Sequence, residues 1–430
     1  MNFLSQITNK SEFNRNVFTL VTGQIIVQVI SFSVGFIITR LYLPEQIGVY
    51  SLFVGITAVL TVVSTGRYDA AIVVEEKEEH IKSLWLLALL ISFCFNFILF
   101  LMLYFFSTPL LNYFNIDGFK KWVFLVPLGV FVGAVIKATQ FYFNRHAAYG
   151  KMKNSEIIKS SFNSVFSVGF GFFKYLSGGL ILANLIGNIG AALFLIFKLP
   201  HTYWQEVKAC FNAGKLKIVA YQYKNYLTSY SLSGLLNVLV TNGTPLFIVY
   251  FFSEKIAGYY FMAEKIISIP IGLIVASISK VFYQKASELY REDKTQFLNL
   301  VNRIQKKMLF FLIPFLILFA FIAPYFFQLF GKGWEQAGEM IKYFAVFLLF
   351  SNWVSPVGTI SNIINRLDIL LYFNISIALF RVITFYLGSL YFNFEYSLLF
   401  SSVVISICYV VFDVVLKGKI KTEIKGEKIT

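Results

Sequence analysis

The chain has 430 residues, of which 57% are hydrophobic and 14% are charged, and its formal net charge is +15. Soluble domains carry roughly 45–50% apolar and about 25% charged residues, so these proportions argue against an ordinary soluble protein. The three cysteines and three histidines are scattered and give neither a disulfide framework nor metal-ligand spacing.

The first apolar run extends from Val17 to about Leu43. It is too long for the core of a signal peptide, and no small-residue cleavage pattern follows it. We therefore interpret this run as a first membrane span that is retained. Similar runs recur along the whole chain, and no soluble domain stands apart from them.

The apolar runs predict an all-α integral membrane protein with twelve transmembrane helices. A bilayer core of about 30 Å needs about 20 apolar residues in a helix, and backbone groups in lipid must bond within the span. The predicted spans are 17–43, 46–65, 83–106, 122–143, 157–173, 179–198, 225–252, 256–279, 308–330, 343–364, 369–392 and 396–416.

The distribution of basic residues predicts the orientation. With both termini in the cytoplasm, cytoplasmic segments hold 27 of the 37 Lys and Arg residues and the opposite loops hold 7. The positive-inside rule favours this orientation. It also accounts for the net charge without nucleic acid, and we expect no nucleic-acid partner. The basic tail, Lys417 to Lys428, is expected to meet anionic lipid headgroups.

An internal repeat divides the predicted spans into two halves. Each half shows the same short motifs at equivalent places: 43–50 after span one and 253–260 after span seven, with Gly48 opposite Gly258 and Tyr50 opposite Tyr260, and then Asn144-Arg145 and Asn365-Arg366. A chance match of short loops is the alternative. Together the pairs predict two six-helix bundles, residues 1–215 and 216–430, of the kind that builds transporters.

Two sequence segments carry a resemblance to a known family. The two six-helix halves, with Leu-Pro-Glu-Gln-Ile-Gly-Val-Tyr-Ser-Leu at 43–52, resemble the MATE-like multidrug/oligosaccharidyl-lipid/polysaccharide exporter superfamily. Within it, Gly66 to Val74, followed by the acidic run Glu75 to Glu79, resembles the segment after span two in bacterial polysaccharide (Wzx-type) flippases. The resemblance covers essentially the whole chain, and the architecture carries most of it.

The resemblance implies a flippase with two helical bundles around a central cleft that alternate between inward- and outward-facing states. Its cargo would be a polyprenyl-pyrophosphate-linked oligosaccharide, moved from the cytoplasmic to the outer leaflet of the bacterial inner membrane for surface polysaccharide, such as O-antigen of lipopolysaccharide, capsule or exopolysaccharide. Implied partners are this lipid-linked oligosaccharide, membrane lipids, and the polymerase and glycosyltransferases of the pathway. No cofactor is expected, and a coupling ion stays open between H⁺ and Na⁺.

Three basic residues lie well inside predicted spans, away from the span ends: Lys137 in span four, Lys265 in span eight and Arg381 in span eleven. A cation at the bilayer centre costs roughly 2.5–3.5 kcal/mol on insertion scales, so it marks a functional candidate. We expect these residues to face the cleft and bind the cargo. The alternative is structural pairing, for example of Lys265 with Glu264.

Neutral polar residues also fall on single helix faces. Gln28 lies with Gln24 and Ser31 in span one, and Asn237 lies with Thr241 and Thr244 in span seven. They are candidates for a wet cleft that binds sugars, or for interhelical hydrogen bonds. Arg67, near Asp69 after span two, is a candidate gate or headgroup contact, or one member of a solvated surface pair.

Two other functions are considered. A multidrug exporter of the same fold is disfavoured because residues 17–43 contain no Asp or Glu and the charges in the spans are mainly basic, which suits an anionic headgroup. A membrane polysaccharide polymerase or other enzyme is disfavoured because the predicted external loops are short and no paired carboxylates or nucleophile constellation is visible. We therefore expect no catalytic residues.

Overall fold

The computed structural model describes residues 2–114, 116–358 and 367–427. Every regular element within them is a helix, so the predicted all-α class is confirmed for the described chain. The chain forms two compact units, Met1–Leu246 (unit 1) and Phe247–Thr430 (unit 2). The connection around residue 215, predicted to join the two halves, packs with unit 1.

Eight helical segments of the described chain are long and apolar enough to cross a membrane. They are Thr22–Leu41, Pro44–Ser64, Glu78–Pro109, Val123–Arg145, Leu176–Phe197, Lys294–Gln328, Asp368–Tyr391 and Phe394–Thr422. A ninth would be the pair Tyr226–Asn242 and Thr244–Phe251, bent by 61°. The chain is therefore a multi-pass membrane protein.

Three further predicted spans fall on helices that are long enough but less apolar. These are α6 (Tyr149–Phe172, 24 residues), α12 (Glu254–Glu292, 39 residues) and α14 (Glu335–Gly358, 24 residues). At 1.5 Å per residue each covers the roughly 30 Å core. The last residues of predicted span 343–364, from 359 on, and the repeat residues Asn365 and Arg366 lie outside the described residues. Twelve spans remain a prediction.

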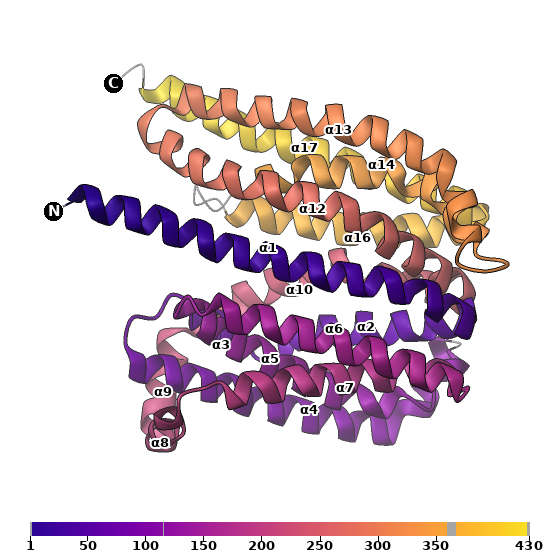
Figure 1. The fold of residues 1–430 in the computed structure, drawn as a ribbon, viewed down its shortest axis with the longest axis horizontal. Coiled ribbons are helices and arrows are strands. Elements are labelled where there is room, and N and C mark those ends of the chain that lie inside the picture. The colour runs from indigo at the N-terminus through magenta and orange to yellow at the C-terminus, as the bar shows by residue number, and fades with distance from the viewer. Residues whose placement is uncertain (1, 115, 359–366, 428–430) are drawn as a thin grey trace. The chain divides into compact units, whose positions relative to one another are not determined.

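Unit 1 contains α6 between two neighbours, packed against α7 on one side and α1 on the other (Figure 1). α2 packs against α5 and α10, and α4 packs against α5. Besides α6, the helices of unit 1 are α1 (Asn2–Leu41), α2 (Pro44–Ser64), α3 (Tyr68–Ala71), α4 (Glu78–Phe114), α5 (Val126–Arg145), α7 (Leu176–Phe197), α8 (His201–Cys210), α9 (Ala213–Gln222) and α10 (Ser231–Asn242). Unit 1 also has two short 3-10 turns, Asp117–Phe119 and Val123–Leu125, and a π-helical turn, η3 (Tyr226–Tyr230).

Unit 2 places α14 against α12, α13 and α17, with α16 packed on α17 (Figure 1). Its remaining helices are α13 (Lys294–Gln328), α16 (Leu367–Tyr391) and α17 (Phe394–Glu427), while α11 (Thr244–Phe251) crosses the boundary between the units. Phe282, Phe297 and Phe412 belong to a buried cluster that joins α12, α13 and α17.

The repeated motif begins a helix in both units. α2 starts at Pro44, which suits the first helical position because proline lacks the N–H that would be unsatisfied there. α12 starts after Ser253, whose hydroxyl accepts a hydrogen bond from the Ile256 backbone N–H at 3.2 Å. Gly48 and Gly258 are both buried within the first turns of these helices.

Large apolar side chains cover the outer surfaces of both units. α4 exposes Phe97 and Phe105 by 57% and 70%, and α13 exposes Phe310 and Phe321 by 75% and 74%. Contiguous exposed apolar surface of this kind is rare on soluble monomers and marks an interaction surface. These faces of α4 and α13 suit lipid.

Candidate functional site

Unit 1 reverses direction in a strained turn after α2. Gly66 has φ 57° and Arg67 has φ 59°, a left-handed conformation that costs a non-glycine residue of order 1–3 kcal/mol and is often found at functional sites. The turn places Asp69 at the start of α3, where it is completely buried (0% exposed). The Thr65 hydroxyl donates to Asp69 Oδ1 at 2.8 Å, and the neighbouring Tyr68 hydroxyl donates to the Ala220 carbonyl at 3.2 Å.

Two buried polar atoms of this turn have no hydrogen-bond partner among the described residues. They are Asp69 Oδ2 and Arg67 Nε. Leaving such a group unsatisfied costs about 1–3 kcal/mol. The Arg67 guanidinium also lies against α10, where a Cβ added to Gly234 would be 3.3 Å from Arg67 Cζ. Arg67 is therefore held inside unit 1 rather than in a solvated surface pair.

Lys137 of α5 interacts with the charged residues of this turn. It interacts electrostatically with Asp69, with Arg67 and with Lys159 of α6. We call Lys137 and its cationic neighbours Arg67 and Lys159 the unit 1 cationic group, and Asp69 is the acidic neighbour of Lys137. The structure thus brings together two residues that the sequence singled out, Lys137 and Arg67. Lys159 was missed because it lies at the edge of a predicted span and was assigned to the cytoplasmic loop.

Side-chain hydrogen bonds also join the helices of unit 1. The Gln140 side-chain amide of α5 donates to Glu156 of α6 at 2.7 Å. Asn184 Nδ2 of α7 donates to Tyr50 Oη of α2 at 3.2 Å, and Asn188 Nδ2 donates within α7 to Asn184 Oδ1 at 2.9 Å. Side-chain hydrogen bonds therefore join α5 to α6 and α2 to α7.

The three neutral candidates lie in different surroundings. Gln28 of α1 is half-buried, and its Oε1 is buried without a hydrogen-bond partner among the described residues. Thr241 of α10 donates to the Asn237 carbonyl at 2.9 Å, a bond within its own helix. Both Asn237 and Thr241 are exposed on the surface of unit 1.

Unit 2 holds a second charged group. Arg381 of α16 is 3% exposed, and its guanidinium lies 5.2 Å from the centre of the Phe347 ring. It interacts electrostatically with Glu264 of α12, which also accepts a side-chain hydrogen bond from Tyr260. We call Arg381, Glu264 and Lys265 the unit 2 charged group.

Lys265 has no ion pair with Glu264 among the described side chains. Adjacent helix positions point about 100° apart, so Glu264 faces Arg381 while Lys265 projects elsewhere from α12 and is half-buried. The pairing suggested by adjacency in sequence is replaced by one between α12 and α16.

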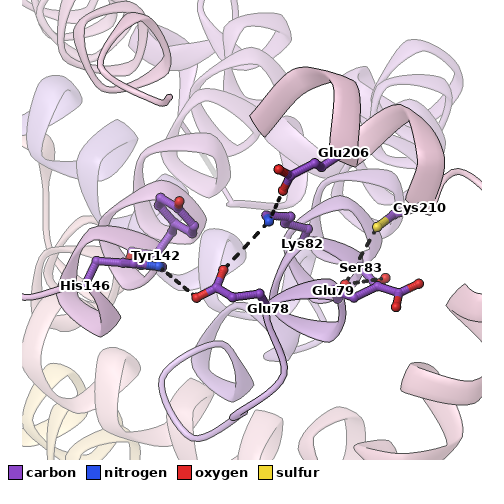
Figure 2. Close-up of polar contacts among 8 residues, drawn as sticks. All are labelled: Glu78, Glu79, Lys82, Ser83, Tyr142, His146, Glu206 and Cys210. Atoms are coloured by element: carbon purple, nitrogen blue, oxygen red, sulfur yellow. Dashed lines mark hydrogen bonds and ion pairs between the residues drawn. The ribbon is translucent and has the colours of Figure 1, made fainter. Parts of the chain in front are cut away.

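The acidic run at the start of α4 binds the helices that follow α7 (Figure 2). Glu78 hydrogen-bonds His146 Nε2 at 3.1 Å and lies 3.8 Å from Lys82 Nζ, which also pairs with Glu206 of α8. Lys215 of α9 pairs with Glu79 at 2.6 Å. We call this set of contacts the α4 clamp.

Glu75 extends the α4 clamp towards the segment after α9. Its carboxylate accepts bonds from the backbone N–H groups of Glu76 and Lys77 at 2.8 and 3.0 Å and from the Tyr223 hydroxyl at 3.0 Å, and it contacts His80 Nδ1 at 3.1 Å. Burial opposes ionisation, but these hydrogen bonds outweigh it and hold the pKa of Glu75 below 4.5. The run Glu75 to Glu79 therefore has a structural role.

The chain was compared with known protein families. A family described as polysaccharide biosynthesis protein matches residues 37–339. The chain belongs to this family. No curated protein matches the chain. The match includes the Arg67–Asp69 turn, the α4 clamp, most of unit 1 and about half of unit 2.

Solved structures share the fold of this polysaccharide biosynthesis family member. An inward-facing multidrug resistance MATE family transporter of the MOP superfamily matches with a TM-score of 0.71 at 15% identity, over 95% of each chain. The lipid II flippase MurJ matches with a TM-score of 0.65 at 13% identity, over 96% of this chain and 87% of its own. A MOP superfamily transporter from Pyrococcus furiosus matches with a TM-score of 0.64 at 13% identity, over 94% and 95%.

These likenesses confirm the MATE-like fold that the sequence resemblance implied. The family member has the fold of MOP superfamily transporters and flippases. No group of His, Cys, Asp and Glu that could hold a metal ion occurs among its described residues.

Proposed function

We propose that this protein is a flippase that moves polyprenyl-pyrophosphate-linked oligosaccharide repeat units across the bacterial inner membrane. Cargo would pass from the cytoplasmic to the outer leaflet by alternating access, for O-antigen, capsule or exopolysaccharide synthesis. The proposal includes twelve spans, two six-helix halves around a central cleft, and cytoplasmic termini. It is carried by one observation: in a polysaccharide biosynthesis family member, basic side chains are buried (Arg381) or half-buried (Arg67, Lys137 and Lys265) among the apolar helices of both units.

The chemistry of these side chains suits a pyrophosphate. Arginine presents a planar fork that binds phosphate oxygens in pairs, and lysine acts as a point charge. In a cleft of reduced dielectric, a fixed cation attracts an anion more strongly than in water. We assign headgroup contact to Lys265, Lys137, Arg381 and Arg67. Glu264 would orient Arg381 through their electrostatic interaction.

Sugar contact is proposed for the neutral candidates. The Gln28 oxygen that lacks a partner among the described residues, and the exposed Asn237 and Thr241 side chains, offer amide and hydroxyl groups to sugar hydroxyls. Polymerase and glycosyltransferases of the same pathway are the proposed partners, and H⁺ or Na⁺ the proposed coupling ion.

Deletion of the gene tests the function. The lipid-linked oligosaccharide should still be made but should stay in the cytoplasmic leaflet, out of reach of an impermeant sugar-binding probe applied outside. Re-expression of the protein should restore exposure. If deletion instead prevents synthesis of the repeat unit, the protein belongs to a transferase and the proposal is wrong.

A multidrug exporter is the second candidate, favoured by the fold match to a MATE transporter with a TM-score of 0.71. Against it, the stretch of α1 from Val17 to Leu41 carries no acidic residue for a cationic drug or its coupling ion. Loss of drug resistance on deletion, with normal surface polysaccharide, would favour the exporter.

A further inference from the structure

Asp69 places a negative charge inside the unit 1 cationic group. The carboxylate is 0% exposed, with Oδ1 held by the Thr65 hydroxyl at 2.8 Å. Oδ2 has no hydrogen-bond partner among the described residues, although it is buried. A buried carboxylate ordinarily satisfies both oxygens, so a half-satisfied one needs an explanation.

The charges near Lys137 of α5 come from several elements. Arg67 lies on the same turn as Asp69, Lys159 lies on α6, and Lys137 interacts electrostatically with all three residues. Tyr226 of η3, which also packs on α3, interacts with Arg67. The charged residues at the start of α4 are engaged elsewhere, namely Glu78 with His146 and Lys82, Glu79 with Lys215, and Lys82 with Glu206.

Asp69 attracts Arg67 and Lys137 but forms no ion pair with either of them among the described contacts. Neither Arg67 nor Lys137 forms an ion pair within 4.0 Å of Asp69 among the described contacts, and Arg67 Nε is the second buried atom of the turn left without a partner. A donor and an acceptor, two residues apart, are thus both unsatisfied. Either they bond to each other in another state, or a ligand satisfies the donor.

We propose that Asp69 is an internal counter-charge that competes with the anionic phosphate headgroup of the cargo for Arg67 and Lys137. This rests on the proposed function and adds to it a residue that sets affinity. While the anion is bound, the cations turn to it and the carboxylate repels it. When the anion leaves, Arg67 and Lys137 relax towards Asp69, which stabilises the empty site.

A transporter needs such a residue because cargo bound too tightly is not released. Three cations without a counter-charge would hold a pyrophosphate strongly at reduced dielectric. Removing the negative charge of Asp69 should therefore strengthen anion binding, by roughly tenfold for a like unit charge about 12 Å away at an effective dielectric constant near 20, and by more at a shorter distance. Export should become slower, because release becomes harder.

The test compares the wild type with Asp69→Asn, which keeps the size of the side chain and an oxygen for the Thr65 bond. Both full-length proteins are placed in nanodiscs and titrated with inorganic pyrophosphate by calorimetry, and surface polysaccharide is measured in cells at equal protein level. We expect about tenfold tighter binding together with reduced surface polysaccharide. Damage to the fold would weaken binding and export together.

Three further variants serve as a control, an alternative to Asp69→Asn and a double variant. Glu206→Gln removes a carboxylate from exposed α8 and should leave pyrophosphate affinity unchanged. Thr65→Val frees Asp69 Oδ1 to attract the cations, so it should weaken pyrophosphate binding, and this can be measured even if Asp69→Asn does not accumulate. Adding Lys137→Gln to Asp69→Asn should abolish the tightening, since Lys137 is one of the cations released.

The outcomes separate the two proposals. If the wild type binds pyrophosphate and Asp69→Asn binds it no more tightly, the counter-charge role is wrong and the proposed function stands. If none of the proteins binds pyrophosphate, the anionic cargo of the proposed function is overturned together with the role of Asp69.

Discussion

The basic residues of the unit 1 cationic group and the unit 2 charged group differ in how many charged side chains lie near them. Arg381 is neutralised in part by Glu264 and lies on the Phe347 ring. Lys137 faces Asp69 but also two other cations. Lys265 forms no ion pair with the neighbouring Glu264 among the described side chains. A cation without a counter-charge gains most from an incoming anion, so Lys265 is the sharpest probe of headgroup binding.

The amount of surface polysaccharide should depend on the charge of the side chain at position 265. At normal protein levels, Lys265→Ala should reduce surface polysaccharide, Lys265→Arg should retain much of it, and Lys265→Glu should abolish it, because only a cation attracts the pyrophosphate. Polysaccharide is measured on whole cells alongside the protein level in membranes. The double change Lys265→Ala with Glu264→Gln should not restore export, since Glu264 faces Arg381; restoration would make Lys265 a structural partner of Glu264.

At the scale of elements, the α4 clamp fixes α8 and α9 to unit 1. Glu75 is the most enclosed carboxylate of the clamp, at 5% exposed, and it accepts bonds from two backbone N–H groups and Tyr223. The segment between α9 and α10 is therefore held against the start of α4 through the hydrogen bond between Tyr223 and Glu75. We expect the clamp to depend on the charge of Glu75.

The charge of Glu75 predicts how the clamp responds to acid. Because the folded-state pKa lies below 4.5, its contribution to stability is present above about pH 4.5 and is lost as the pH falls through the folded value. Glu75→Gln should lower the unfolding free energy at pH 7 by about 1 kcal/mol, and the difference from wild type should shrink at acid pH. Thermal unfolding between about pH 3.5 and 7 measures this. Glu76→Gln, an exposed neighbour, is the control, and an equal loss in both variants would contradict the assignment.

The contact between α6 and α7 depends on a glycine. A Cβ added at Gly187 would lie 2.6 Å from the backbone oxygen of Lys159, whereas one added at Gly169 would meet nothing within 4 Å. Small residues allow such close approach of membrane helices. Gly187→Ala should force α6 and α7 apart and destabilise unit 1 by about 1–3 kcal/mol.

Gly169→Ala is the matched control for this contact. It should be neutral or stabilise α6 by up to about 1 kcal/mol, because alanine favours a helix over glycine. Both variants are compared by thermal unfolding of the purified protein. Equal melting temperatures for the two variants would show that the helices tolerate the added methyl group.

For the whole molecule, the charge bias and the exposed apolar helix faces predict one orientation in the membrane. Reporter fusions at Asn212 and Thr295 should report the cytoplasm, and fusions at Asp117 and Trp334 should report the outside, since positive loops stay on the cytoplasmic side. Enzymatic reporters active on one side of the membrane measure this. A reversed pattern at any two of the four sites would contradict the twelve-span topology.

The class of the protein, most of its helices and its family resemblance can be predicted from the amino-acid sequence. The apolar runs predicted spans that the structure confirms, such as Pro44–Ser64 and Leu176–Phe197, because each span must satisfy its own backbone in lipid and so carries its signal locally. The motif at 43–52 and the run Gly66 to Glu79 indicated the family for the same reason, since each is contiguous in sequence.

Which side chains of different helices meet can be seen only in the folded protein. Adjacency suggested that Glu264 pairs with Lys265, but Glu264 faces Arg381 from another helix. The sequence also left Asp69 between a gate and the surface, whereas the fold buries it completely. Such pairings depend on the rotation and axial position of one helix against another, which packing along the whole interface sets. A single helix's sequence defines its faces but not the neighbour that each face will meet.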